Sequence, residues 1–351
     1  MNSMKQLTAI TDPVFIKPTK YSNVDKFFLK LIRDERDLPF IYLTLKITFT
    51  IILLGVLLYM PFVHGWLWWG IAAVYAYLNN FVFKGPFGLM LHCTSHRVFF
   101  NKKYKFLNYY LPWIVAPFFG HSPETYFTHH IGMHHAENNL QGDESTTMPF
   151  QRDSLKDFSI YFGKFLFRGV YDLAMYFFNK KRKRLMYRSV RGEVLFILFC
   201  VALSFISLKA TLWVFIIPLF IYRLVAMMGN WAQHSFIDAA DPGNEYKNSI
   251  TCINTKYNQK CWNDGYHISH HEKQTMHWTE HPGYFQKTLK NYLVNNAIVF
   301  DGIHFLHVFM WLMRKRYDLL ARNFVLLDNK NRNTEEIVAF LKSRTKKIPF
   351  S

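Results

Sequence analysis

Residues 47–63 read ITFTIILLGVLLYMPFV and residues 64–83 read HGWLWWGIAAVYAYLNNFVF, and neither run contains a charged side chain. A second pair of runs occupies residues 194–208 (VLFILFCVALSFISL) and 210–222 (ATLWVFIIPLFIY), with Lys209 between them. A helix needs about 20 mostly apolar residues to cross a bilayer. The four runs therefore predict helices that span a membrane, grouped as two hairpins.

The expected fold is an all-α integral membrane protein with four transmembrane helices. The spans are predicted at about 40–63, 65–84, 192–208 and 210–230. Half of the 351 residues are hydrophobic and only 19% are charged, whereas soluble domains carry about 25% charged residues. Core helices of a soluble protein are the alternative, and paired apolar runs with tryptophan-rich ends disfavour it.

The basic residues predict the orientation of the chain in the membrane. The link around His64 and Gly65 has no Lys or Arg, whereas the segment from Arg97 to Arg191 has fifteen and the first 36 residues have seven. Lys and Arg concentrate on the cytoplasmic side of membrane proteins. Both termini and the long middle segment are therefore expected in the cytoplasm, with a bacterial inner membrane favoured and the endoplasmic reticulum possible.

A run of five basic residues, Lys180-Lys181-Arg182-Lys183-Arg184, precedes the third predicted span. Such runs next to a membrane bind anionic lipid headgroups. The net charge of +18 is also compatible with nucleic-acid binding, but the membrane spans make this the weaker interpretation. We expect anionic membrane lipids as partners and no nucleic acid.

The expected domain organisation has three parts. Residues 1–39 form a cytoplasmic amphipathic segment, residues 40–290 the membrane domain, and residues 291–351 a cytoplasmic helical segment. Within the membrane domain, residues 85–191 and 231–290 are predicted to form a cytoplasmic helical cap.

Three histidine clusters fall on the predicted cytoplasmic side. They read His92-Cys-Thr-Ser-His96, His129-His130-Ile-Gly-Met-His134-His135 and His267-Ile-Ser-His270-His271, and His234 follows the fourth span. Helical positions three or four apart share a face, so each cluster can direct several imidazoles to one centre. Adjacent positions are about 100° apart, so His135 can reach a neighbouring centre.

Nine imidazoles are too many for one ion, and we predict two ions. The predicted metal ligands are His92, His96, His130, His134, His135, His234, His267, His270 and His271. His129 competes with His130, which is preferred because it pairs with His134 at four-residue spacing. Imidazole suits iron, zinc, copper and nickel, so ligand type leaves the metal open.

The remaining histidines and the missing motifs narrow the chemistry. His64, His304 and His307 are interpreted as surface or packing residues, and His121, His277 and His281 are weaker candidates near the clusters. The sequence contains no H-E-x-x-H motif, which disfavours a zinc protease. It also contains no Walker loop, G-x-G-x-x-G fingerprint or G-x-S-x-G elbow, so no nucleotide or flavin site is expected.

With these clusters in this order around two hairpins, residues 40–290 resemble the membrane fatty acid desaturase superfamily. Asn230 and His234 are similar to the Asn-x3-His pair of acyl-CoA desaturases, in which the asparagine holds a metal-bound water. Residues 263–271 (NDGYHISHH) look like the third histidine box of that group. The resemblance implies a non-haem di-iron centre, with O2 as co-substrate, that removes two hydrogens from an acyl chain.

The box spacings depart from one branch of the superfamily. The first box is His-x3-His, where stearoyl-CoA desaturases have His-x4-His, and the second has three residues before its paired histidines where that group has two. Similar spacings occur in acyl-lipid desaturases, alkane hydroxylases and sterol oxidases. A membrane di-iron hydroxylase or monooxygenase is therefore the alternative function, and a non-enzymatic metal-binding membrane protein is a more distant one.

Supporting residues and partners complete the prediction. Metal-bound histidines usually donate their outer N–H to a carboxylate or carbonyl, and Asp264 and Glu137 are the preferred candidates beside Asn230. The substrate is expected to be an acyl-CoA, an acyl lipid or an acyl carrier. No electron-carrier domain is visible, so a separate ferredoxin or cytochrome with its reductase is expected as the donor.

Overall fold

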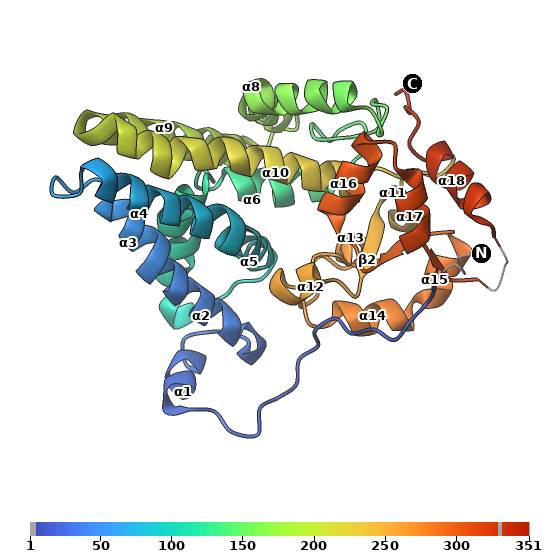
Figure 1. Ribbon diagram of the computed structural model, residues 1–351, viewed down its shortest axis with the longest axis horizontal. Coiled ribbons are helices and arrows are strands. Elements are labelled where there is room, and N and C mark those ends of the chain that lie inside the picture. The colour runs from blue at the N-terminus through green and yellow to red at the C-terminus, as the bar shows by residue number, and fades with distance from the viewer. Residues whose placement is uncertain (1–4, 329–331, 351) are drawn as a thin grey trace. The chain divides into compact units, whose positions relative to one another are not determined.

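The computed structural model describes residues 5–328 and 332–350, and most of this part of the chain is helical (Figure 1). The chain divides into two compact units. The hairpin unit comprises residues 16–132 and 170–224, and the C-terminal unit comprises residues 1–15, 133–169 and 225–351.

The first apolar stretch of the hairpin unit folds as two helical rods. The first rod consists of α2 (Leu38–Ile47), η2 (Thr48–Ile52) and α3 (Leu53–Leu57), and the second of α4 (Gly65–Tyr77), η3 (Leu78–Phe83) and α5 (Lys84–His96). The rods meet near their link, where the indole N–H of Trp68 donates to the carbonyl oxygen of Leu58 (3.0 Å). The first rod ends at Leu57, before the predicted end of the first span at residue 63, and the second continues to His96, beyond the predicted end at residue 84.

The second apolar stretch forms α9 (Lys183–Thr211), η8 (Leu212–Ile216) and α10 (Ile217–Gln233). Backbone dihedrals at Ser207 (φ −157°, ψ 100°) interrupt the helix, two residues before the link predicted at Lys209. The freed amide of Ala210 donates to the Ser207 hydroxyl oxygen (3.2 Å), which compensates for the lost helical bond. The turn therefore comes slightly earlier than the sequence suggested.

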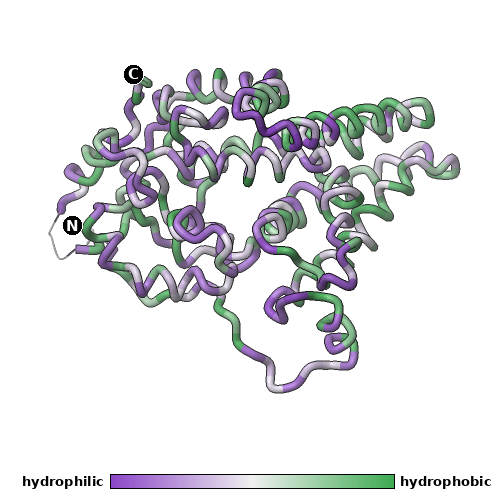
Figure 2. Tube along the Cα trace, turned by 180° about the vertical axis from the view of Figure 1, so that it is seen from behind, coloured by the Kyte–Doolittle hydropathy of each residue, from purple (hydrophilic) through white to green (hydrophobic). Residues whose placement is uncertain are grey.

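In the part of the chain that the structure describes, two helices are long enough and apolar enough to cross a membrane. They are Glu35–Leu57 and Lys183–Gln233. Figure 2 shows long green, hydrophobic stretches along the helical hairpins. The large exposed side chains there are apolar, including Phe49, Phe81 and Phe205, which are 69%, 82% and 89% exposed. Exposed apolar surface of this extent requires a partner other than water.

Shorter elements complete the hairpin unit. They are α1 (Asn23–Leu29), η1 (Glu35–Asp37), η4 (Lys102–Tyr109), η5 (Tyr110–Val115), η6 (Ala116–Phe119) and α6 (Thr125–His129). Gly120 ends η6 with φ +86°, and a Cβ there would overlap the backbone of Pro218 and Leu219. Only glycine allows this close approach to the second hairpin.

The C-terminal unit contains short strands, which the all-α prediction did not include. β2 (Ile250–Ile253) pairs in parallel with β3 (Ile298–Asp301), and β1 (Lys5–Gln6) pairs in parallel with β4 (Val325–Leu326). All residues of β2 and β3 are buried, as expected for a parallel pair covered on both faces. The protein is therefore mostly, but not purely, α-helical.

Helices surround these strands in the C-terminal unit, and three helical elements continue from one unit into the other. The surrounding helices are α7 (His135–Glu137), α11 (Glu245–Asn248), α12 (Lys256–Lys260), α13 (His267–Glu272), α14 (His281–Lys287), α15 (Leu289–Val294), α16 (Phe305–Met313), α17 (Tyr317–Asn323) and α18 (Thr334–Ser343). The continuing elements are η7 (His130–His134), α8 (Leu155–Asn179) and α10.

Candidate metal centre

The third histidine box lies on α13, and the residues before it fix where this helix begins. The carbonyl oxygen of Gly265 accepts from the amide of Cys252 in β2 (2.7 Å), and its own amide donates to the Asn258 side chain (2.9 Å). A Cβ at position 265 would overlap the Cys252 carbonyl oxygen. Glycine therefore allows the box to pack directly against the buried strand.

Four histidines of the C-terminal unit converge on one point. They are His134 from η7, His234 after α10, and His267 and His271 from α13. One ring nitrogen from each lies within 4.8 Å of the others, and all four residues are buried. The Nε2 atom of His267 is 3.2 Å from that of His234 and 3.0 Å from that of His271.

The outer nitrogens of three of these histidines face acceptors. His134 Nδ1 lies 2.6 Å from Asp143 Oδ2, and His234 Nδ1 lies 3.0 Å from the Asn248 carbonyl oxygen. His271 Nδ1 lies 3.6 Å from Glu245 Oε2. A proton on each Nδ1 leaves the Nε2 lone pair directed into the cluster.

Converging lone pairs repel each other unless a cation lies between them. With metal–nitrogen bonds of about 2.0–2.1 Å, two imidazole nitrogens on one ion lie roughly 3.0–3.4 Å apart. The observed Nε2 separations of 3.0 and 3.2 Å match this range. The four-histidine cluster therefore fits a transition-metal ion, and imidazole donors of this kind suit iron.

Asp143 is itself held rigidly. Its Oδ1 accepts from the amide and the hydroxyl of Ser145 (2.7 and 2.6 Å), and its Oδ2 also accepts from the amide of Asn139 (3.1 Å). Asn139 has a positive φ of 57°, and its side chain donates to Asn248 Oδ1 (2.9 Å). One hydrogen-bonded network thus orients both His134 and His234.

Glu245 is a supporting residue that the sequence prediction missed. Besides facing His271, it accepts a hydrogen bond from the Asn138 side chain (3.0 Å). Burial raises the pKa of Glu245 to about 7. The residue lies outside the histidine boxes, on α11, and no spacing rule connects it to them.

The hairpin unit brings together three more predicted ligands. His92 and His96 are one helical turn apart on α5, and the Nε2 atoms of His96 and His130 are 3.1 Å apart. The His92 and His130 rings are 4.6 Å apart between centroids. Tyr126 stacks on His130 at 5.4 Å, which orients this ring. His130, rather than His129, faces His96.

Two predicted ligands remain, and both belong to the C-terminal unit. His135 on α7 and His270 on α13 face each other with their Nε2 atoms 2.9 Å apart. His270 and the adjacent His271 point in different directions from α13, as the 100° helical step requires. All nine histidines predicted as ligands thus belong to groups of imidazoles with facing nitrogens.

The three predicted supporting residues have identifiable neighbours. The Asn230 amide donates to the Tyr161 hydroxyl (2.7 Å) and to the Ser145 carbonyl oxygen (3.0 Å). Asp264 Oδ2 accepts from the Tyr257 hydroxyl (3.2 Å). The Glu137 carboxylate lies so close to Gly142 that a Cβ there would overlap it.

Several histidines outside the predicted ligand set support the fold. His281 is buried with its Nδ1 2.7 Å from the Ser269 hydroxyl, and His277 Nδ1 is 2.7 Å from the Thr279 hydroxyl. His304 caps α16. His281 supports the third box indirectly, because Ser269 lies within that box.

A cavity of about 240 Å³ lies inside the hairpin unit. Its walls are mainly apolar and include Leu91, Val98, Phe99, Leu111, Trp113 and Phe127. Ser95 and Tyr126 also line it; the first precedes His96 on α5 and the second stacks on His130. Two charged residues, Glu124 and Arg188, also line the cavity, and Glu124 Oε1 accepts a hydrogen bond from Arg188 Nε (3.2 Å).

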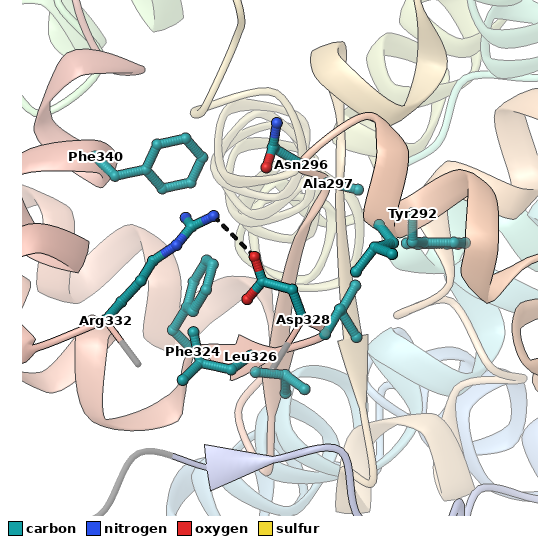
Figure 3. A pocket seen from close by; sticks show the side chains of 11 residues that line it. Tyr292, Asn296, Ala297, Phe324, Leu326, Asp328, Arg332 and Phe340 are labelled. Carbon is teal, nitrogen blue, oxygen red and sulfur yellow. Dashed lines mark hydrogen bonds and ion pairs between the residues drawn. The ribbon is translucent and has the colours of Figure 1, made fainter. Parts of the chain in front are cut away.

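A second cavity, in the C-terminal unit, is much smaller. Figure 3 shows Arg332 and Asp328 joined across it by an ion pair of 3.2 Å, with Phe340 and Tyr292 also in its wall. Its volume of about 20 Å³ is enough for roughly one water molecule. It cannot hold an organic substrate.

The helical hairpins and the histidine groups define a mostly helical protein with long apolar segments and a candidate metal centre. The chain belongs to the fatty acid desaturase family, whose model matches residues 81–301, more than half of its length. This confirms the resemblance inferred from the histidine boxes. No curated protein and no solved structure matches the chain. Family membership implies an oxidoreductase with a lipid substrate, an electron donor and a membrane location.

Proposed function

We propose that this protein is an O2-dependent acyl desaturase that introduces a double bond into a fatty acyl chain with a histidine-bound di-iron centre. The main support is the four-histidine cluster, in which buried imidazole nitrogens converge within 4.8 Å. The outer nitrogens of three of them face Asp143, Asn248 and Glu245, the arrangement typical of metal-bound histidines.

The proposed ligand set uses the remaining histidines for a second iron. The remaining predicted ligands are His92, His96, His130, His135 and His270. Bound iron would activate O2 and so supply the oxidising power that side chains lack. The chain contributes ligand geometry, a fixed histidine tautomer and exclusion of water from buried imidazoles.

The proposed reaction balances with external electrons. A saturated –CH2–CH2– unit, O2, two electrons and two protons give –CH=CH– and two waters. A ferredoxin or cytochrome with its reductase is proposed as the donor, in line with the electron donor that the family implies.

The cavity of the hairpin unit is the proposed acyl site. Its apolar wall suits a hydrocarbon chain, and Ser95 and Tyr126 connect it to the surroundings of His96 and His130. Glu124, at the polar part of the cavity, has a positive φ of 63°. Strained residues often lie at functional sites, and we assign Glu124 and Arg188 to the acyl head group.

The proposed membrane topology has four spans, with both termini and all histidine boxes on the cytoplasmic side. The two long apolar helices support it, and so does the excess of Lys and Arg between Arg97 and Arg191.

The test is expression in a host that lacks desaturases, followed by gas chromatography–mass spectrometry with a double-bond-locating derivative. We expect a new unsaturated fatty acid that disappears in His271→Ala, together with iron from the purified protein. His64→Ala is the matched control, because this exposed histidine lies in the link between α3 and α4. A hydroxylated lipid would indicate a monooxygenase instead, and a wild-type protein without iron would contradict both.

A further inference from the structure

Helix α8 carries apolar side chains on two faces. One face is buried against the protein and includes Phe158, Tyr161 and Phe177. The other is exposed, with Ile160, Phe167, Tyr171 and Phe178 at 54%, 84%, 62% and 54% of their full accessibility. A helix with one apolar face packed on its own protein normally presents polar residues to water, so the exposed face of α8 needs a partner.

The exposed residues form a continuous stripe. At 100° per residue, positions 160, 167, 171 and 178 lie within about 20° of one line along the helix. This regularity distinguishes them from scattered surface apolar residues, which need no explanation.

Basic side chains flank the stripe. Lys156 and Lys164 lie about 40° to either side of it and Arg168 about 80° away, and all three are exposed. The run Lys180–Arg184 follows at the end of the helix. Lys164 pairs with Glu144 at the edge of the stripe (3.0 Å), Asp157 pairs with Lys347 (2.9 Å), and Asp172 is buried.

A transmembrane helix is not the explanation. Lys164, Arg168 and Asp172 interrupt α8, and it is not among the helices apolar enough to cross a membrane in the described part of the chain. An apolar stripe with aromatic residues and flanking Lys and Arg is instead typical of a helix lying in the membrane interface. Long basic side chains can extend from such a helix to the phosphates while their stems stay in apolar surroundings.

We propose that α8 is an interfacial anchor that inserts Ile160, Phe167, Tyr171 and Phe178 into an anionic phospholipid surface. Chain continuity agrees with this partner, since α8 ends at Asn179 and the membrane-compatible helix α9 begins at Lys183. Between them, Lys181 has a positive φ of 58°, which turns the chain sharply. The anchor does not depend on the reaction that the histidines perform.

The test uses the full chain in lipid nanodiscs with a polarity-sensitive fluorophore on Phe167→Cys or Phe178→Cys. The native cysteines are buried or half-buried, and the unsubstituted chain, labelled in parallel, gives the background. Gln259→Cys on α12, also exposed, is the control position. We expect blue-shifted emission at both α8 positions and about a twofold quench by spin-labelled lipids, with neither at 259.

Trace spin-labelled phosphatidylglycerol and phosphatidylcholine then distinguish the lipid classes. The anionic lipid should quench position 178 more strongly, and Lys180→Gln, Lys181→Gln and Lys183→Gln together should remove the difference. Water-like emission at both α8 positions would overturn the proposal. Equal quenching by the two lipids would also overturn it. A blue shift that spin-labelled lipids do not quench, accompanied by cross-linking between two copies of the chain, would overturn it as well, because it would indicate a protein partner.

Discussion

Asp143 Oδ2 lies 2.6 Å from His134 Nδ1, and both side chains are almost completely buried. The carboxylate fixes the ring so that its Nε2 faces His234, His267 and His271. Loss of such a carboxylate typically lowers metal affinity about 10- to 100-fold. We expect Asp143→Asn to reduce bound iron under chelator competition by this factor, measured by elemental analysis.

The control for this prediction is Glu137→Gln. The sequence favoured Glu137 as a supporting residue, whereas the structure places Asp143 against His134. We expect Glu137→Gln to retain more iron than Asp143→Asn. The reverse order would show that the Asp143–His134 contact does not orient the ligand.

Glu245 provides a graded comparison with Asp143. Its separation of 3.6 Å from His271 Nδ1 is too long for a good hydrogen bond. Glu245→Gln should therefore lower iron affinity less than Asp143→Asn in the same chelator titration. Equal losses would mean that the Glu245–His271 contact shortens when metal binds.

The sequence was most informative where the signal is local. His92 and His96 are four residues apart on one helix, as are His267 and His271, so helical geometry alone brings each pair together. The apolar runs likewise predicted where the helices of the two hairpins form. The break at Ser207 was missed by two residues because Lys209 was the more conspicuous interruption.

Long-range pairings could not be predicted in this way. β2 pairs with β3 across more than forty residues, and neither strand has an alternating pattern because both are fully buried. The carboxylates that face the histidines are a second example. Asp143 approaches His134 from the loop after α7, whereas Glu245 approaches His271 from α11, and sequence spacing predicts neither approach.

His281 predicts a pH dependence of stability. Burial, with a smaller effect of His277, lowers the pKa of His281 to about 3, below the unfolded value of about 6.5. The unfolded state therefore binds more protons between these values, and stability contributed by the neutral ring is lost as pH falls below 6.5.

When the pH falls from 6.5 to 5, protonation of this group in the unfolded state should lower the free energy of unfolding of the metal-free protein by about 2 kcal/mol. His281→Gln should lose less stability than the wild type over the same interval, as measured by denaturant unfolding in detergent. The slopes are compared rather than the absolute stabilities, because the substitution also alters the contact with Ser269. Parallel slopes would show that His281 titrates normally.

The contacts of Arg152 indicate that the stability of the C-terminal unit depends on its last residues, from Arg344 onward. The guanidinium is fully buried and donates to carbonyl oxygens of residues 147, 148, 150, 235, 344 and 346. Thr147 in turn donates through its hydroxyl to the His234 carbonyl oxygen (2.7 Å). The tail and the loop beside the four-histidine cluster therefore share one hydrogen-bonding centre.

Arg152→Met should leave several buried carbonyl oxygens without donors, at about 1–3 kcal/mol each. Arg152→Lys should recover only part of this loss, because one ammonium cannot reach both sides of the fork. Deleting residues 344–351 should lower the melting temperature too, and by less in Arg152→Met than in wild type, since both changes remove the same contacts. Additive losses in this double-mutant cycle would show that the tail is held by other residues.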